Sequence, residues 1–305
     1  MKCNICPRAC HVDRSVNKGF CGMTNDIYAA RAALHMWEEP CISGEHGSGA
    51  VFFSGCTLRC IFCQNAEIAA AHVGKKITVE RLSDIFLELQ DKCANNINLV
   101  TATHFVPQVA EALVKAKNKG LVIPVVYNSS AYENVSTLNM LDGLVDVYLP
   151  DMKYIDSRLS AEYSKAPDYA DVAKAAIHEM VRQTGKPEFF IVDDELVKSG
   201  RVEAGIMKKG VIVRHLVLPG TTKDSKAVIK YLIDTYGDDI YISIMSQYTP
   251  FERLKKHPLL SRKVTRKEYN SVVDYAIDCG INNGFIQEGD VAEESFIPEF
   301  DYEGI

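Results

Sequence analysis

Apolar, β-branched runs alternate with amphipathic stretches from about residue 46 onward. The short runs are continuously apolar, which is typical of strands buried on both faces of a sheet. The longer stretches carry apolar residues at helical spacing. The predicted strands are residues 50–54, 97–101, 123–127, 145–149, 211–218 and 240–245. The predicted helices between them are residues 78–94, 106–119, 135–144, 161–184 and 225–236.

This strand–helix order predicts an α/β fold with a parallel sheet and right-handed crossovers. Six such units are too few for a closed eight-unit barrel; they fit a doubly wound sheet or, as we predict, a partial (β/α)6 barrel. We expect the barrel over residues 46–257, with a Cys-rich metal-binding element at 1–45 before it and a C-terminal extension at 258–305 that packs back on it.

Smaller elements complete the prediction. Residues 186–211 predict a hairpin inserted before the fifth strand. Thr265 with Glu268 three positions later predicts a capped helix over 265–278. The apolar stretches 284–287 and 296–300 are irregular, and we expect them to pack against the barrel.

Polar side chains follow the predicted strands at their carboxyl ends. Parallel strands bring these ends to one edge of the sheet, where ligands bind in such folds. The sequence therefore predicts a binding site on this rim. Its candidate residues are Thr101, Thr103, His104, Asn128, Ser129, Asp151, Lys153, Arg214 and His215.

The composition narrows the class of protein. The 305 residues carry a formal net charge of −6, which disfavours a general nucleic-acid binder. There is no run of 18 apolar residues and no apolar signal core in the first residues, so we expect a cytoplasmic protein without a membrane span. Thiols stay reduced there, which makes the ten cysteines better candidates for metal ligands than for disulfides.

Cys56, Cys60 and Cys63 form a C-x3-C-x2-C run directly after the first predicted strand. Three thiolates in eight residues can hold three corners of an iron–sulfur cube and leave the fourth iron without a protein ligand. An under-ligated metal offers a position for a substrate or cofactor, as an open site on catalytic zinc does. The alternative is that the three thiols are buried core residues.

These motifs resemble the radical S-adenosylmethionine (SAM) superfamily, in particular the branch related to pyruvate formate-lyase activating enzyme. The resemblance rests on the three cysteines with Phe62 between them, on Asp151-Met-Lys153 and on residues 214–220. The N-terminal cysteine segments also resemble a poorly characterised subgroup of that branch. These segments are Cys3-Asn-Ile-Cys6-Pro-Arg-Ala-Cys10 and Gly19-Phe-Cys21-Gly22. The resemblance implies a [4Fe-4S] cluster on Cys56, Cys60 and Cys63. SAM would bind its open iron and be cleaved reductively to a 5′-deoxyadenosyl radical that abstracts hydrogen.

The resemblance also implies cofactor contacts. Phe62 would lie near adenine, Asn128 and Ser129 near the ribose or carboxylate, and Asp151 with Lys153 near SAM or a bound cation. Arg214 and His215 are candidates for carboxylate or substrate contacts, and strand alternation favours Arg214 as the one facing the cavity. The family's Gly-Gly-Glu segment is replaced by Thr101-Ala-Thr103-His104. His104 is alternatively a structural histidine, and Asp151 with Lys153 a solvated ion pair.

Cys3, Cys6, Cys10 and Cys21 have spacings that suit a structural zinc or an auxiliary iron–sulfur cluster, with unliganded thiols as the alternative. Cys41 is a candidate replacement for one of them. Cys93 and Cys279 lie in helical patterns and are expected in the core.

The leading hypothesis is a radical SAM enzyme that receives electrons from a donor such as a flavodoxin or ferredoxin. Its substrate would be a glycyl radical protein, another protein or a small molecule. One alternative is a non-catalytic iron–sulfur or zinc protein that senses redox state or carries electrons. Another is an RNA- or protein-binding module built around the N-terminal cysteines, of which the RNA version is disfavoured by the acidic charge.

Overall fold

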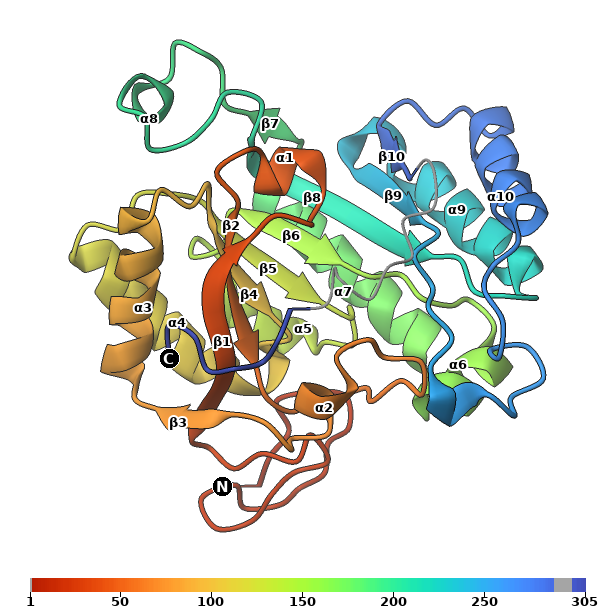
Figure 1. Ribbon diagram of the computed structural model, residues 1–305, viewed down its shortest axis with the longest axis horizontal. Coiled ribbons are helices and arrows are strands. Elements are labelled where there is room, and N and C mark those ends of the chain that lie inside the picture. The colour runs from red at the N-terminus through yellow and green to blue at the C-terminus, as the bar shows by residue number, and fades with distance from the viewer. Residues whose placement is uncertain (1, 288–297) are drawn as a thin grey trace.

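The computed structural model describes residues 2–287 and 298–305. A ten-stranded sheet forms the frame, in the order β10-β9-β8-β6-β5-β4-β2-β1-β3, with β7 paired to β8 (Figure 1). Adjacent strands are parallel from β2 to β10, and β1 and β3 add an antiparallel edge. The strands are β1 Ile27–His35, β2 Ser48–Phe53, β3 Lys75–Ile77, β4 Ile97–Val100, β5 Val125–Ser129, β6 Val147–Pro150, β7 Glu188–Phe189, β8 Met207–Leu216, β9 Tyr241–Met245 and β10 Gly284–Ile286. The predicted α/β class with a mostly parallel sheet is confirmed.

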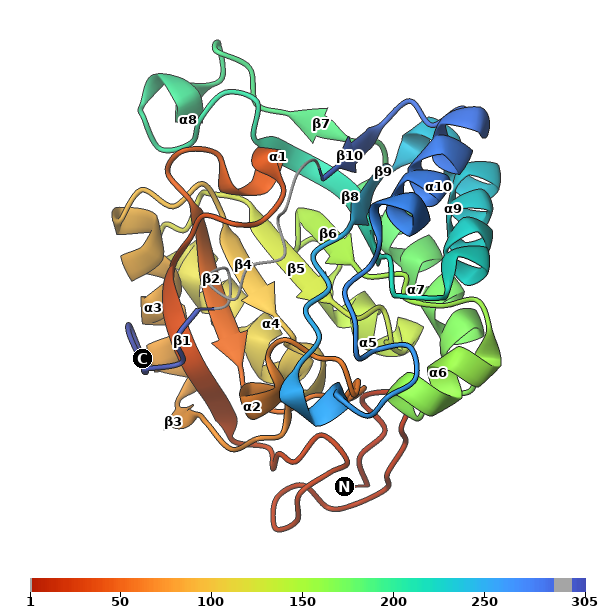
Figure 2. The same cartoon turned by 45° about the vertical axis from the view of Figure 1, so that its right-hand side comes forward.

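Helices in the crossovers cover the outer face of the curved sheet (Figures 1 and 2). Their buried residues form one core with the outward side chains of the strands. The crossover helices are α3 Val79–Asp91, α4 Val106–Asn118, α5 Val135–Leu138, α6 Ser157–Ser164, α7 Tyr169–Thr184, α9 Thr222–Tyr236 and α10 Arg266–Asp278. The short helices are α1 Pro40–Ser43, α2 Ala66–Ala69 and α8 Glu195–Lys198. Helix α10 begins at the predicted capping box of Thr265 and Glu268.

Three parts of the chain differ from the sequence prediction. The expected helix 161–184 is two helices, α6 and α7, because Lys165 adopts a left-handed conformation at φ 52° and Pro167 follows it. The expected helix 135–144 is α-helical only to Leu138 and continues as a 3-10 turn. The predicted hairpin is the two-residue strand β7 paired with the start of β8, with α8 between them.

The sheet extends beyond the predicted barrel on both sides. Strand β1 lies within the segment assigned to the Cys-rich element, and its alanine-rich sequence has low β propensity. It is a strand because β2 and β3 pair with it. On the other side, α10 and β10 form a further helix–strand unit within the segment assigned to the C-terminal extension.

The amino ends of the strands are closed by α1. The side-chain amide of Asn96 donates to the Ile42 carbonyl at 2.7 Å, and that of Asn95 to the Ser43 carbonyl at 2.9 Å. Ile42 is fully buried against residues of β5, β6 and β8. Any cavity inside the sheet must therefore open elsewhere, toward the carboxyl ends.

Residues 298–305 run along β1, where the Ala32 amide donates to the Glu303 carbonyl at 2.8 Å. Phe300 packs edge-on against Phe52 with ring centroids 5.6 Å apart. Of the apolar stretch 296–300, residues 296 and 297 lie outside the described residues. Among the helices of the described chain, none is long and apolar enough to cross a membrane.

Candidate active site

A cavity of about 520 Å³ lies inside the curved sheet at the carboxyl ends of its strands. This volume is within the range of small-molecule and cofactor sites. Most of the residues that the sequence singles out lie on its wall. They are Cys56, Cys60, Phe62, Cys63, Thr101, Asn128, Ser129, Asp151, Lys153 and Arg214.

Thr103 and His104 do not line this cavity. Thr101 has a left-handed φ of 62°, and a 3-10 turn over Thr103–Phe105 follows. The Thr103 hydroxyl donates to Glu133 at 2.6 Å, and His104 Nε2 lies 2.7 Å from the Ser54 carbonyl. Burial lowers the pKa of His104 to about 3. His104 is therefore a neutral histidine that holds the backbone at Ser54, two positions before Cys56. This is the structural role that the sequence allowed as the alternative to a cofactor contact.

The cysteine loop leaves β2 through Ser54 and Gly55. Gly55 has φ +86°, and a Cβ there would lie 2.7 Å from the Cys21 carbonyl, so this turn has room only for glycine. The Cys56 sulfur accepts hydrogen bonds from the amides of Leu58 at 3.3 Å and Arg59 at 3.4 Å. The loop therefore offers backbone donors to a thiolate.

The three cysteines are half-buried at the cavity wall, and the protein around Cys60 and Cys63 shields their thiols from water. Burial raises the pKa of Cys60 and raises that of Cys63 to about 12. Such groups become thiolates when a metal replaces the proton. Ser164 Oγ lies 3.0 Å from the Cys60 sulfur and can donate to it. These donors and the three-cysteine spacing fit an iron–sulfur cluster.

No group of three or more His, Cys, Asp or Glu side chains within residues 2–287 and 298–305 is arranged to hold a metal ion. A cluster with four irons does not require such convergence, because each thiolate binds a different iron. The donor set therefore fits a polynuclear cluster better than one ion.

Aromatic rings hold Phe62 at the cavity wall. Its ring makes edge-on contacts with Tyr154, Tyr163 and Tyr248 at centroid distances of 6.4, 6.4 and 6.5 Å. The Phe62 side chain therefore presents a fixed apolar surface beside the cysteines.

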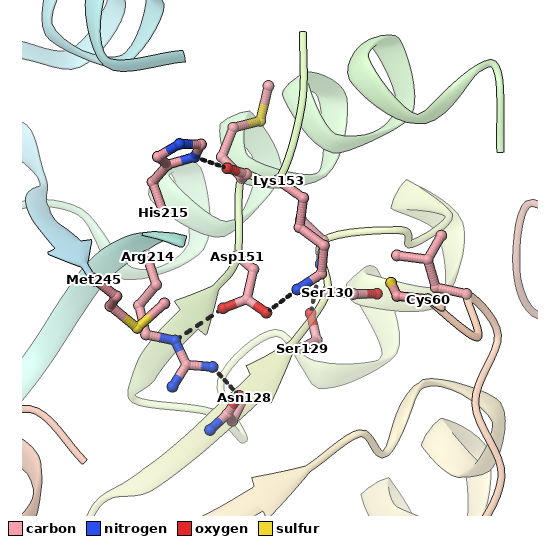
Figure 3. Close-up of polar contacts among 12 residues, drawn as sticks. Cys60, Asn128, Ser129, Ser130, Asp151, Lys153, Arg214, His215 and Met245 are labelled. Carbon is pink, nitrogen blue, oxygen red and sulfur yellow. Dashed lines mark hydrogen bonds and ion pairs between the residues drawn. The ribbon is translucent and has the colours of Figure 1, made fainter. Parts of the chain in front are cut away.

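A chain of charged side chains crosses the cavity wall between strands (Figure 3). Lys153 Nζ donates to Asp151 at 2.6 Å, and Arg214 Nε donates to the other oxygen of Asp151 at 2.9 Å. Arg214 also donates to the Asn128 side chain at 2.6 Å and to Glu38 at 2.9 Å. The planar guanidinium thus links β5, the segment after β6 and the segment after β1.

The electrostatics of this chain of ion pairs follow from burial and proximity. Burial alone would raise the pKa of Asp151, but Arg214 and Lys153 outweigh it and hold that pKa below its usual value. The Asp151 and Lys153 side chains are each only 17% exposed. The alternative of a solvated ion pair is therefore not what the structure contains.

His215 lies next to Arg214 on β8 but faces the other side of the strand (Figure 3). Its Nδ1 is 2.7 Å from the Met152 carbonyl, and burial lowers its pKa to about 4. Arg214 is therefore the member of this pair that reaches the cavity.

Sequence reasoning missed Glu38 and Glu39, which enter the cavity from the connection between β1 and α1. Glu38 accepts from the side chains of Asn98 at 3.0 Å and Asn128 at 3.1 Å as well as from Arg214. The signal in the sequence was weak: two tandem acids before Pro40, in a segment with no strand-like pattern.

The N-terminal cysteines lie against the cysteine loop. The Cys56 amide donates to the Cys21 carbonyl at 3.3 Å. The sulfurs of Cys10 and Cys21 are both close to Gly19, where an added Cβ would lie 3.3 Å from one and 3.4 Å from the other. Cys3 and Cys6 belong to the same loops. An isolated antiparallel β-bridge between the backbones of Lys2 and Asp13 closes these loops. Burial raises the pKa of Cys6 to about 12.

The remaining cysteines lie away from this group. Cys41 is buried in α1 at the opposite end of the strands. The expectation that Cys93 and Cys279 lie in the core is wrong: Cys93 is exposed and Cys279 half-buried. Cys93 follows the end of α3, where the chain leaves the buried face with φ 62°.

The parallel α/β sheet and the three-cysteine loop at its rim fit an iron–sulfur protein, and comparison with known proteins identifies the family. The profile of the Radical SAM superfamily matches residues 50–232, and the chain belongs to this superfamily. It is similar to "Uncharacterized protein MJ0674" of Methanocaldococcus jannaschii, with 28% identity over 90% of this chain and 74% of that protein.

Solved structures show the same fold. Streptococcus suis SuiB bound to precursor peptide SuiA has 14% identity and a TM-score of 0.50, covering 78% of this chain and 47% of that one. The chain thus spans about half the length of this match. A domain of pyruvate-formate lyase-activating enzyme from Bacteroides vulgatus has 10% identity and a TM-score of 0.38, covering 60% of this chain and 91% of that one.

Proposed function

We propose that the chain holds a [4Fe-4S] cluster on Cys56, Cys60 and Cys63, binds SAM in the cavity, and abstracts a hydrogen atom from a substrate. When bound, the cluster and SAM supply the chemistry: one-electron cleavage to a 5′-deoxyadenosyl radical. The observation that carries the proposal is that the cysteine loop, Phe62 and the Asp151 ion pairs line one cavity.

The side chains of the cavity orient SAM in this proposal. Arg214 and Lys153 offer positive charge that Asp151 keeps fixed in direction. Asn128 and Ser129 offer hydrogen bonds at the end of β5, and Phe62 an apolar surface for adenine. Thr101 presents polar backbone and a hydroxyl at the end of β4. The enclosing sheet excludes water from a reactive intermediate.

The proposal extends to the substrate, the electron donor and the N-terminal metal. A glycyl radical protein as substrate is supported by the resemblance of the sequence motifs, and a flavodoxin or ferredoxin as electron donor by the need for single electrons. For Cys3, Cys6, Cys10 and Cys21 we propose zinc or an auxiliary cluster, supported by their spacing and by the nearness of the Cys10 and Cys21 sulfurs to Gly19. The auxiliary cluster is favoured, because the described thiols are not arranged around a single ion.

The test is reductive SAM cleavage by anaerobically reconstituted protein. SAM and dithionite are added, 5′-deoxyadenosine is measured by chromatography, and iron and zinc are counted on the same sample. Cys60→Ala should lose the cavity cluster and the product while keeping the N-terminal metal. Cys93→Ala is the matched control, because Cys93 is an exposed thiol outside the cavity. Product from Cys60→Ala would refute the proposed mechanism. A reducible cluster in the wild type with neither product nor a SAM-induced change in its EPR spectrum would favour an electron carrier.

A further inference from the structure

The cavity has a second end that the proposed SAM chemistry does not use. Asp151 binds Lys153 through one carboxylate oxygen and Arg214 through the other, and Arg214 continues to Glu38. Figure 3 places Cys60 on the Lys153 side of Asp151 and Arg214 on its other side. The Asp151–Arg214 pair therefore separates a cysteine end of the cavity from an acidic end that holds Glu38 and Glu39.

The strand register places the acidic end deeper in the sheet. Glu38 contacts Asn98 and Asn128, and Asn98 lies level with Val126, two positions before Asn128 on β5. The cysteine loop, by contrast, begins beyond the last residue of β2. The acidic end therefore forms the floor of the cavity, and the cysteines lie at its rim.

Glu39 is a buried carboxyl group with one oxygen that accepts no hydrogen bond from the described residues. It is 8% exposed and lines the cavity, and the oxygen without a partner among the described residues is Oε2. It is the N-cap residue of α1, but its side chain makes no capping hydrogen bond. The Ser243 side chain lies within hydrogen-bonding reach. Burial, with Glu38 adding to it, raises the pKa of Glu39.

The charges on the described wall do not balance. Its carboxylates are Glu38, Glu39 and Asp151, and its cations are Lys153 and Arg214. Both cations already contact Asp151, and Arg214 also contacts Glu38. Glu39 is therefore the carboxyl group of the described wall that has no cation in direct contact, although Arg214 acts on it at longer range. A buried carboxylate without a direct partner is costly.

We propose that Glu39, with Ser243 beside it, anchors a protonated primary amino group of the substrate at the floor of the cavity. Apolar side chains of the same cavity, among them Phe52, Met245 and Phe285, suit an aliphatic stem that runs from this group toward the rim. The inference rests on the proposed function, since it assigns the substrate end of that cavity. It names the substrate class as amines: a lysine side chain, an amino terminus and a free alkylamine share this chemistry.

The chain contains its own reporter for the test. Trp37 is its single tryptophan, and it lines the same cavity. We would titrate n-butylamine, which is protonated at pH 7.5, into holoprotein saturated with SAM and follow Trp37 fluorescence. n-Butanol is the neutral isostere, and butyrate carries the opposite charge. Butylammonium should bind about tenfold or more tightly than butanol, and butyrate more weakly than either.

Variants locate the effect at Glu39. Glu39→Gln should abolish the preference for butylammonium, and Glu39→Asp should retain part of it. Glu133→Gln is the matched control, because Glu133 is also buried with an unpartnered oxygen but does not line the cavity. This variant should prefer butylammonium over butanol as strongly as the wild type does. Circular dichroism shows whether each variant is folded.

Three outcomes overturn the inference. The first two are equal binding of butylammonium and butanol to the wild type and an unchanged preference in folded Glu39→Gln. The third is competition of butylammonium with SAM, since Glu39 would then belong to the SAM site. The titration requires no turnover, so a failure of the inference is distinguishable from a failure of SAM cleavage, which would refute the proposed function.

Discussion

Replacing Asp151 by Asn tests whether its carboxylate holds the cavity wall together. Asp151 accepts two charge-assisted hydrogen bonds, from Lys153 at 2.6 Å and Arg214 at 2.9 Å, with 17% of its side chain exposed. Each such bond contributes about 1.5–3 kcal/mol. The amide retains one acceptor, but it leaves two cations without a counter-charge between them. We expect the free energy of unfolding to fall by about 3 kcal/mol.

The assay is thermal unfolding of the holoprotein by circular dichroism, where a loss of this size lowers Tm by roughly 6 °C. Asp142→Asn is the control: Asp142 pairs with Arg182 at 2.8 Å, but both side chains are about half exposed, at 46% and 54%. Solvent screens such a pair, and its loss costs less than about 1 kcal/mol.

A second substitution separates the charge effect from a packing effect. In Asp151→Asn/Lys153→Met, the buried lysine charge is absent, while Arg214 still pairs with Glu38 at 2.9 Å. The double variant should therefore regain about 1–2 kcal/mol relative to Asp151→Asn. Equal stability of Asp151→Asn and the wild type, or a double variant less stable than the single one, would refute the reasoning.

Two further predictions concern the surroundings of the site. Burial raises the pKa of Glu133 to about 7, above the 4.5 of an unfolded glutamate. Between these two pH values the folded state keeps a proton on Glu133 that the unfolded state releases, so the free energy of unfolding falls as pH rises through this range. Urea unfolding should therefore show Glu133→Gln more stable than the wild type at pH 8 and no more stable at pH 5; the same difference at both values would contradict this. Arg8 donates to the carbonyls of Thr57 and Ser164, both at 2.8 Å, so Arg8→Gln should release the cysteine loop and reduce iron per protein after reconstitution. Unchanged iron content would show that the loop keeps its shape without this contact.

Much of the fold follows from local pattern. The apolar runs that form β2, β4, β5, β6, β8 and β9 are recognisable because strands buried on both faces have little polar interruption. Strand β1 is not recognisable in this way, since its alanine-rich sequence becomes a strand only by pairing with neighbours. The break between α6 and α7 follows Lys165 and was signalled by Pro167, which a long helical pattern obscured.

Local sequence is enough to identify the cysteine loop and most of the polar rim. Cys56, Cys60 and Cys63 are adjacent in the chain, and the ends of parallel strands must meet at one edge. Tertiary structure alone decided which side chains reach the cavity. It turned His104 inward to Ser54. It also brought Glu38 to Arg214, 176 positions away. Such contacts depend on the curvature of the sheet and the path of α1 beneath it, and no local period in the chain records either of them.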